Sequence, residues 1–574
     1  MELGSGIIHR IIHPTAAHYE PPPTNPVHFD NANLTSQPPA NWEASQLNPK
    51  NRVDSFGPLS HPAWRIDGCT GLGTQFYAIP LFLESIPPMR IDVFIPEQSS
   101  QSEQVRDLLD LDVAFHTKDR VRIQQLNVTR HILRALQYWT KSLADPAALF
   151  TSLPFGSRIV FKDLSLNVRA INIDVAPTYY LERQLLSASA LSAMWADAVS
   201  LPLPDCVDIS EVHVVEQVHD SVCLVLIGGR LWILKTLTSY TKYLYHELKL
   251  LLSAEPHPSI MSRPAHLVTK RCSFGSKVAV IGFTLEYHRY GTLRDVVPFL
   301  QGTGMLTPTE QFKWALQITL GVIHRRETSG TFYPDLRLDN VVLSKDRDAV
   351  MVDFEQRGVW CEFASPEVNA IEYVRILATD EELPDDVRDR YAERLEVLCP
   401  GFELLQNREE YTNPANGYNI CWTSLSPQEQ EASEVYMLGR VLWCIFEGAS
   451  APQQASIWQS YRREADVDFP EYRRTPPKLR ALIDDCTRGR RATLNSKVGR
   501  EGSRITFKDA DGADNTGDIQ RAAAAWWKRE ISWAEEFLTM REEARQAGRW
   551  RDNHFGRPSL RDVLKRLEEL RDGP

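Results

Sequence analysis

Between residues 205 and 300 the apolar positions follow the short pattern of β-strands. Val212–Val218 and Ser221–Ile227 flank a polar His-Asp pair, and Arg230–Leu237 follows a Gly-Gly pair. Tight polar or glycine connections between strand-like runs are typical of an antiparallel meander. A helix is expected next at about Tyr240–Ser253, followed by another strand at Lys277–Glu286.

Beyond residue 307 the pattern changes to helical spacing. One helical face carries Phe312, Leu316, Leu320 and Ile323. The chain is therefore predicted to form a small β-rich unit followed by a larger helical one.

The stretch 63–203 mixes both patterns, which predicts a separate α+β region without indicating its function. Its strand-like runs are Phe76–Phe82, Arg90–Ile95 and Ala170–Ile173. Its two helical faces are Val128, Ile132, Leu133 and Leu136, and Leu185, Leu186, Leu191 and Met194.

Residues 1–62 show no apolar periodicity over most of their length. They are rich in Pro, Asn, Ser and Gln, with proline runs at Pro21–Pro23 and Pro38–Pro39. Such a composition predicts a disordered or loosely attached tail.

The composition narrows the class of protein. With 574 residues, of which 43% are hydrophobic, the chain can bury more than one core. Its formal net charge of −11 provides no overall basic field, so nucleic-acid binding is not expected. The nine cysteines form no close pair, and no apolar run reaches the roughly 20 residues of a membrane span. An intracellular protein, cytoplasmic or nuclear and without a secretory signal, is expected.

Five residues supply, in order along the chain, the groups that phosphoryl transfer from ATP requires. Phosphoryl transfer requires a cation for the phosphates, oxygen ligands for Mg²⁺ and a carboxylate that orients the attacking hydroxyl. Lys235 ends the third predicted strand, and Glu247 on the next helix could hold it in place. Asp335 and Asn340 share one polar segment, and Asp353 follows an apolar strand.

The region from about Asp205 to Leu570 resembles the eukaryotic protein kinase family at these residues. Four short motifs carry the likeness in the family's order: Trp232-Ile-Leu-Lys235, Tyr333-Pro-Asp335 with Asn340, Asp353-Phe-Glu355 and Ser365-Pro-Glu367. Arg557 near the C-terminus matches the arginine that pairs with the last of these glutamates. The resemblance therefore implies a buried Glu367–Arg557 ion pair.

The resemblance also implies how ATP and Mg²⁺ would be held. Lys235 would contact the α- and β-phosphates, and Glu247 would position Lys235. Asn340 and Asp353 would bind Mg²⁺.

At the acceptor side the resemblance implies roles for two further groups. Asp335 would orient the acceptor hydroxyl, and Arg337 stands where the family has a catalytic-loop lysine. Arginine keeps the positive charge but not its point geometry.

Several departures from the family pattern leave other functions open. Gln217–Ser221 contains no glycine where the family has a glycine-rich loop, which favours an inactive pseudokinase scaffold. Glu355 replaces a glycine, as in small-molecule kinases of the choline-kinase-like and aminoglycoside-kinase-like type. Pro334 replaces an arginine, and Ser365 is the only hydroxyl residue from 353 to 367, so activation by phosphorylation there is not expected.

The first hypothesis is thus a divergent Ser/Thr-type protein kinase that uses ATP and Mg²⁺ on a protein substrate. The implied fold is α+β and two-lobed, with a small antiparallel β lobe and a large helical lobe over residues 204–570. Insertions are expected at about 369–427 and 489–551, beside the additional α+β region of residues 63–203.

Overall fold

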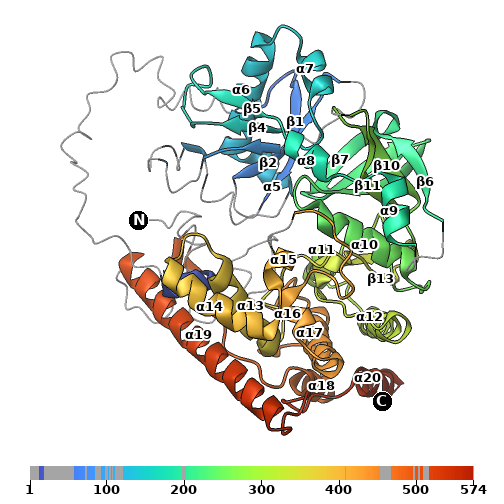
Figure 1. Cartoon of the computed structure of the whole chain (residues 1–574), viewed down its shortest axis with the longest axis vertical. Helices are drawn as coiled ribbons and strands as arrows, with labels where there is room; N and C mark the ends of the chain where they lie inside the picture. Colours follow the sequence, from blue (N-terminus) through green and yellow to red (C-terminus); the bar gives the residue numbers. More distant parts are fainter. Residues whose placement is uncertain are drawn as a thin grey trace.

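A computed structural model describes most of the chain as a mixed α+β structure, as the apolar pattern predicts (Figure 1). The described residues are 12–18, 57–70, 74–83, 92–96, 101, 105, 108–109, 111, 120–196, 202–273, 275–406, 409–452, 467–494, 498–501, 504–507 and 516–572.

A five-stranded sheet forms the first unit, in the order β1-β2-β3-β4-β5 and antiparallel except between β3 and β4. Val128, Ile132 and Leu136 of α6 are each 0% exposed in a core separate from that of the remaining chain. These three residues lie on the predicted helical face. The elements are β1 (Trp64–Cys69), β2 (Gln75–Pro80), β3 (Asp92–Phe94), α5 (Arg120–Gln125), α6 (Asn127–Ser142), α7 (Pro146–Ser152), β4 (Arg158–Phe161) and β5 (Ile173–Ala176).

The strand predicted at Ala170–Ile173 starts later than expected, because β5 covers Ile173–Ala176. Asn167 forms a turn just before it. Its side-chain Oδ1 accepts the N–H of Arg169 at 3.1 Å, and its carbonyl accepts the N–H of Ala170 at 2.9 Å. This local turn competes with strand pairing and delays the strand.

Of the residues predicted on one helical face, Leu191 and Met194 lie in a helix, α9 (Ala188–Met194), whereas Leu185 and Leu186 follow the end of α8 (Tyr179–Gln184). Leu185 is extended, with ψ 139°. Ser187 begins α9, because its hydroxyl accepts the N–H three residues later. The predicted helical face is therefore confirmed for Leu191 and Met194 and wrong for Leu185 and Leu186.

The stretch expected to be a tail includes an ordered turn. Residues Pro14–Ala17 form the 3₁₀-helix η1, which packs against α13 (Pro366–Thr379) and α19 (Thr516–Gln546), and Ala16 is buried. Figure 1 shows η1 beside these helices. Residues 1–11 and 19–56 of the expected tail lie outside the described residues.

A six-stranded sheet, in the order β6-β10-β11-β9-β8-β7, follows. The predicted meander is confirmed, since β7, β8 and β9 are antiparallel neighbours. The predicted helix and the following strand are confirmed as α10 and β11. The elements are β6 (Asp205–Asp208), η5 (Ile209–Glu211), β7 (His213–His219), β8 (Val222–Ile227), β9 (Arg230–Thr236), α10 (Thr241–Ser253), β10 (His266–Arg271) and β11 (Val278–Glu286).

The two sheets are joined at the free edge of β7. The Arg65 guanidinium donates to the carbonyl of Val215 at 2.6 Å, and the Asp67 carboxylate accepts the backbone N–H of Gln217 at 2.8 Å. The side chains of β1 thus satisfy edge groups of β7 that no strand pairs with.

The rest of the described chain is mainly helical. The helix predicted after residue 307 is confirmed as α12, which begins behind the Thr307 cap and ends at Gly330, where φ is 61°. The stretches expected as insertions hold α14 to α16, and β14, β15 and α19. The remaining elements are α11 (Leu293–Gly302), α12 (Pro308–Ser329), η6 (Leu338–Asn340), β12 (Val341–Leu343), β13 (Ala349–Met351), α14 (Asp385–Leu398), α15 (Phe402–Gln406), α16 (Ile420–Thr423), α17 (Pro427–Glu447), α18 (Pro477–Cys486), β14 (Val498–Glu501), β15 (Arg504–Phe507) and α20 (Leu560–Asp572).

The predicted contact between Glu367 and Arg557 is confirmed. The guanidinium Nη1 and Nη2 donate to Oε1 and Oε2 of Glu367 at 2.7 and 2.9 Å, and both residues are buried. Arg557 Nη1 also donates to the carbonyl of Ala432 in α17 at 3.0 Å. The pair therefore fastens the start of α13 to α17 and to the segment before α20.

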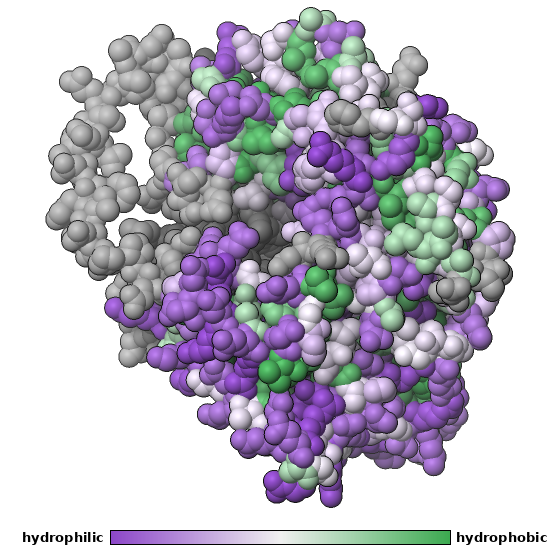
Figure 2. Space-filling view, viewed as in Figure 1, coloured by the Kyte–Doolittle hydropathy of each residue, from purple (hydrophilic) through white to green (hydrophobic). Residues whose placement is uncertain are grey.

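The face drawn in Figure 2 is mostly hydrophilic over α14 and α19. Among the described residues, no helix combines the length and the apolar character needed to cross a bilayer.

Candidate active site

Lys235 lies at the centre of a buried group of charges. It comes from β9, and its Nζ lies 2.6 Å from Oε2 of Glu247 in α10. The same ammonium donates to Oδ1 of Asp353 and lies 3.4 Å from Oε2 of Glu355. The ion pair expected between Lys235 and Glu247 is therefore present, and it includes two further carboxylates.

Glu247 also connects α10 to the chain that follows Asp353. Its side chain is fully buried, and its Oε1 accepts the backbone N–H of Phe354 at 2.9 Å. One carboxylate thus holds both the strand lysine and the backbone just after β13. Any movement of α10 would break both contacts.

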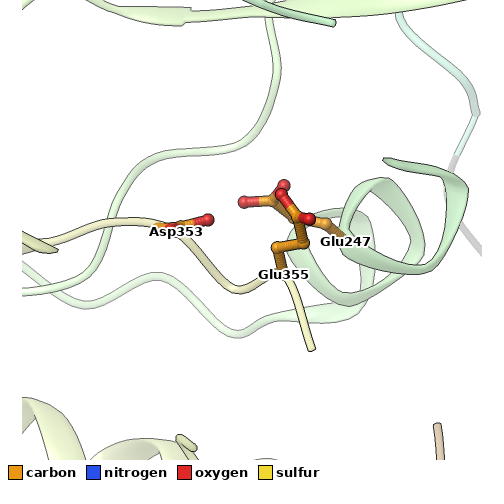
Figure 3. A group of neighbouring side chains, drawn as sticks. All are labelled: Glu247, Asp353 and Glu355. Carbon is orange, nitrogen blue, oxygen red and sulfur yellow. The ribbon is translucent and has the colours of Figure 1, made fainter. Parts of the chain in front are cut away.

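The carboxylate oxygens of Glu247, Asp353 and Glu355 point toward one another (Figure 3) and lie within 4.8 Å. Among the described residues two cations contact them, Lys235 and Arg357, and the Nε of Arg357 lies 2.7 Å from Glu355 Oε1. The group therefore keeps an excess of negative charge. Such an oxygen set suits a hard divalent cation such as Mg²⁺.

The protonation equilibria reflect this crowding. Burial would lower the pKa of Lys235, but the three carboxylates outweigh it and raise that pKa above its ordinary value. Burial raises the pKa of Glu247 against the pull of the lysine ammonium, and the two neighbouring carboxylates add to the rise. The pKa of Asp353 is lowered, because Lys235 outweighs the effect of burial. A bound cation would relieve the same repulsion that raises the pKa of Glu247.

Asp353 has an unusual backbone. Its φ is 62°, in the left-handed region that favours glycine. Such a conformation costs about 1 kcal/mol or more and persists where the surroundings impose it, often at functional sites. Here the Lys235 ammonium holds the Asp353 carboxylate, and Glu247 accepts the N–H of Phe354, the next residue.

Asp335 and Asn340 form a second polar group beside the first. Asn340 Nδ2 donates to Oδ2 and to the backbone carbonyl of Asp335, both at 2.9 Å. Arg337 Nε donates to the same Oδ2 at 3.0 Å, and its guanidinium stacks on Trp360, 4.6 Å from the ring centre. The Asp335 side chain remains 22% exposed, so the carboxylate is partly open to solvent.

The two groups are joined through the backbone. The N–H of Val352 donates to the carbonyl of Asn340 at 2.9 Å, and the Tyr333 hydroxyl donates to the carbonyl of Val352. Val352, the residue before Asp353, is therefore hydrogen-bonded to the loop that carries Asp335.

The carboxylate set differs from the predicted Asn340 and Asp353 pair. Glu247 and Glu355 lie within ligand distance of Asp353, whereas the Asn340 amide N–H is directed to Asp335. The sequence suggested Glu355 as an additional carboxylate, but Glu247 was predicted only as a partner of Lys235. No sequence signal distinguishes these two roles.

Arg357 was not predicted as a site residue. It binds Glu355 at 2.7 Å, and its Nη1 lies 3.7 Å from Asp220 Oδ2 in the β7–β8 turn. His219 Nδ1 lies 2.5 Å from the other oxygen of Asp220. The glycine-free turn is thus attached to the segment that follows Asp353. The sequence feature that points to Arg357 is its position two residues after the acidic Asp353-Phe-Glu355 motif.

Ser365 is the N-cap of α13, and it is 0% exposed. Its hydroxyl accepts the N–H of Val368 at 3.4 Å and donates to Ser433 Oγ at 2.9 Å. Ser365→Ala should lower the free energy of unfolding by about 1 kcal/mol, the usual value of an N-cap, and leave nucleotide binding unchanged.

Urea unfolding and nucleotide titration of the wild type and of Ser365→Ala would measure the changes in stability and in nucleotide binding. We also expect phosphatase treatment to leave any activity intact. A phosphate mapped to Ser365 that raises activity would contradict the assignment of this residue as a structural cap.

No protein-family model matches the chain, and no curated protein matches it. A function for this site is therefore inferred from the geometry of the site itself.

Proposed function

We propose that the chain is an ATP- and Mg²⁺-dependent phosphotransferase of two-lobed, protein-kinase-like architecture, a divergent Ser/Thr-type protein kinase. The observation that carries the proposal is the joint contact of Lys235 with Glu247 and Asp353, next to the Asp335–Asn340 loop. A buried lysine that meets the carboxylates of a helix and of a post-strand segment is the arrangement that phosphoryl transfer in protein kinases needs. The confirmed Glu367–Arg557 contact is consistent with it.

Each charged group then has a task. Lys235 would bind the α- and β-phosphates, and Glu247 would keep its ammonium in place. When bound, Mg²⁺ would neutralise the charge on the phosphates. Asp353 and Glu355 are the carboxylates that would hold it, and Asn340, whose amide N–H donates to Asp335, would add its Oδ1.

The acceptor hydroxyl would lie against Asp335. The carboxylate orients the hydroxyl oxygen toward the γ-phosphorus and accepts its proton as the new P–O bond forms, while the bond from the γ-phosphorus to the β–γ bridging oxygen breaks and ADP leaves. Arg337, which binds Asp335 and stacks on Trp360, fixes the carboxylate and supplies positive charge beside the phosphoryl group. The partly exposed side of Asp335 is where a hydroxyl of a protein substrate would enter.

A second candidate function is a nucleotide-binding scaffold without turnover. The observation that favours it is the contact of the glycine-free β7–β8 turn with Arg357 through Asp220. A loop that bends over the phosphates needs glycine for a close backbone approach, and here the turn is fastened by side chains instead. Phosphoryl transfer with bound ATP separates the two candidates.

A small-molecule kinase is the remaining alternative. Glu355 favours it, since this carboxylate stands where protein kinases have a glycine. Nucleotide turnover stimulated by a small alcohol, with no phosphorylation of proteins, would support this alternative over a protein substrate.

The central experiment is a thermal-shift titration with ATP, with and without Mg²⁺. A ligand that binds the folded state stabilises it by RT ln(1 + [L]/Kd) and so raises the melting temperature as its concentration rises, and a metal-dependent shift is expected. Excess chelator should abolish the shift. Absence of any shift would contradict the proposal.

Asp353→Asn should weaken metal-dependent ATP binding by about tenfold or more, because a charged oxygen ligand becomes neutral. The measurement is the ATP dissociation constant at fixed Mg²⁺, by fluorescence or calorimetry. The matched control is Asp386→Asn at the exposed start of α14, which should bind like the wild type. Equal affinity of Asp353→Asn and the control would disprove the metal assignment.

A further inference from the structure

Residues 409–419, between α15 and α16, form a segment that we name the clamp segment. Two of its aromatic rings pack on α10. Tyr418 contacts Tyr243 and His246 at ring-centre distances of 5.7 and 5.6 Å, and Tyr411 contacts Tyr245 at 5.7 Å. Both clamp tyrosines are buried, at 3% and 6% exposure. Edge-to-face aromatic pairs of this kind fix relative positions as well as adding buried area.

Polar contacts extend this attachment along α10. Lys249 Nζ donates to Asn413 Oδ1 at 2.7 Å. Near the start of the helix, the buried Lys242 donates to the carbonyl of Leu405 at 2.6 Å and lies 5.3 Å above the Tyr418 ring. The helix is therefore held on both sides of Glu247.

The clamp segment also holds the chain that follows Asp353. The backbone N–H of Tyr418 donates to Gln356 Oε1 at 3.0 Å, and Asn419, the last residue of the segment, donates to the carbonyl of Gly358 at 2.7 Å. Gly417 makes room for Gln356: its φ is 81°, and a Cβ there would lie 1.8 Å from Gln356 Oε1. Only glycine fits this position.

A third set of contacts fixes the clamp segment to the end of α9 (Ala188–Met194). Trp195 Nε1 donates to the Tyr411 hydroxyl at 2.9 Å. Asn413 Nδ2 donates to the carbonyl of Met194 at 3.0 Å. The clamp segment is thus bonded to the end of α9 while it contacts α10 and the chain that follows Asp353.

We infer that the clamp segment holds α10 where Glu247 reaches Lys235, with Tyr418 as the central positioning residue. The inference rests on the proposed function for its catalytic meaning. In protein kinases the lysine–glutamate pair must be formed for activity, and phosphorylation of the activation loop controls it. Here Pro334 replaces the arginine of the catalytic loop. Ser365, the one hydroxyl residue from 353 to 367, is buried. The packing of the clamp segment thus keeps the Lys235–Glu247 pair formed, as a phosphate on the activation loop does in those kinases.

The first test is hydrogen exchange of the full chain without nucleotide. In Tyr418→Ala we expect the amides of α10 (Thr241–Ser253) to exchange at least about tenfold faster, while those of α17 (Pro427–Glu447) keep their wild-type rates. Tyr418→Phe keeps the ring on α10 and removes the hydroxyl that accepts the N–H of Thr412, so α10 itself should exchange as in the wild type. Tyr391→Ala, which empties an equally buried tyrosine site on α14, should leave α10 unchanged.

A milder variant covers the case in which Tyr418→Ala does not fold. Asn413→Gly removes the bonds to Lys249 and Met194 but suits the backbone, whose φ is 53°. It should accelerate exchange in α10 by a smaller factor. Unchanged α10 exchange in both variants, or an equal increase in α17, would overturn the inference.

The second test measures catalysis. Tyr418→Ala should lower kcat/KM for ATP about tenfold, mainly through KM, and should have no further effect in a Glu247→Gln background, because the ring acts through that carboxylate. Additive losses would show that Tyr418 does not act through Glu247. If the wild type binds no ATP, the proposed function fails, but the hydrogen-exchange experiment still tests whether the clamp segment holds α10.

Discussion

Replacing Asp335 with asparagine is expected to lower kcat by about 10²–10⁴-fold, the range for a lost acid or base group. The amide can still accept the bonds that Asn340 and Arg337 donate to the carboxylate, so the loop should keep its shape. It cannot take a proton from the acceptor hydroxyl. Among the described contacts none joins Asp335 to Lys235, so the ATP dissociation constant should change little.

The measurement is a phosphate-transfer assay beside an ATP titration of the same protein. Asp339→Asn is the matched control. This neighbouring carboxylate binds Arg294 at 2.5 Å and lies 3.6 Å from Arg337, and its loss should cost far less activity. Full activity of Asp335→Asn would remove this residue from the mechanism. If the wild type binds ATP without transfer, the scaffold function would hold instead.

The β-meander could be predicted because its determinants are local. The polar pair before β8 and the glycines before β9 turn the chain, and the strands pair with their neighbours in sequence. The bounds of helix α12 were equally predictable, since a threonine cap begins it and a glycine ends it, although Leu320 of the predicted apolar face is 40% exposed.

The errors occur where a few local bonds outweigh an apolar pattern. Leu185 and Leu191 suit one helical face, yet the hydroxyl of Ser187 starts a new helix between them. The N-terminal turn η1 was missed for a different reason. Pro14–Ala17 has no pattern of its own and gains order only by packing on α13 and α19, which lie hundreds of residues later.

The site was predictable as an order of residue types but not as a geometry. Lys235 and Asp353 are 118 positions apart, and their meeting depends on β9, α10 and β13 together. Glu247 enters the same carboxylate group because distant residues such as Tyr418 hold α10 against it. Such long-range packing leaves no periodicity in the sequence.

Loss of either partner of the Glu367–Arg557 pair should lower the free energy of unfolding by about 3–5 kcal/mol, since a buried charge is left unpaired. The two residues are 190 positions apart, and both guanidinium nitrogens of the fork engage the carboxylate. Arg557→Ala should be the more damaging change. It also removes the bonds to the carbonyls of Ala432 and Arg488, both at 3.0 Å, and the contact with the Tyr436 ring.

A double-mutant cycle measured by urea unfolding tests this prediction. The double alanine variant should lose much less stability than the two single losses together, because each single change already abolishes the shared ion pair. Glu327→Ala is the control, as it removes an exposed partner of Arg561 and should cost no more than about 1 kcal/mol. Fully additive losses would mean that the pair is not an energetic unit. The link between α13, α17 and the segment before α20 would then have to come from apolar packing alone.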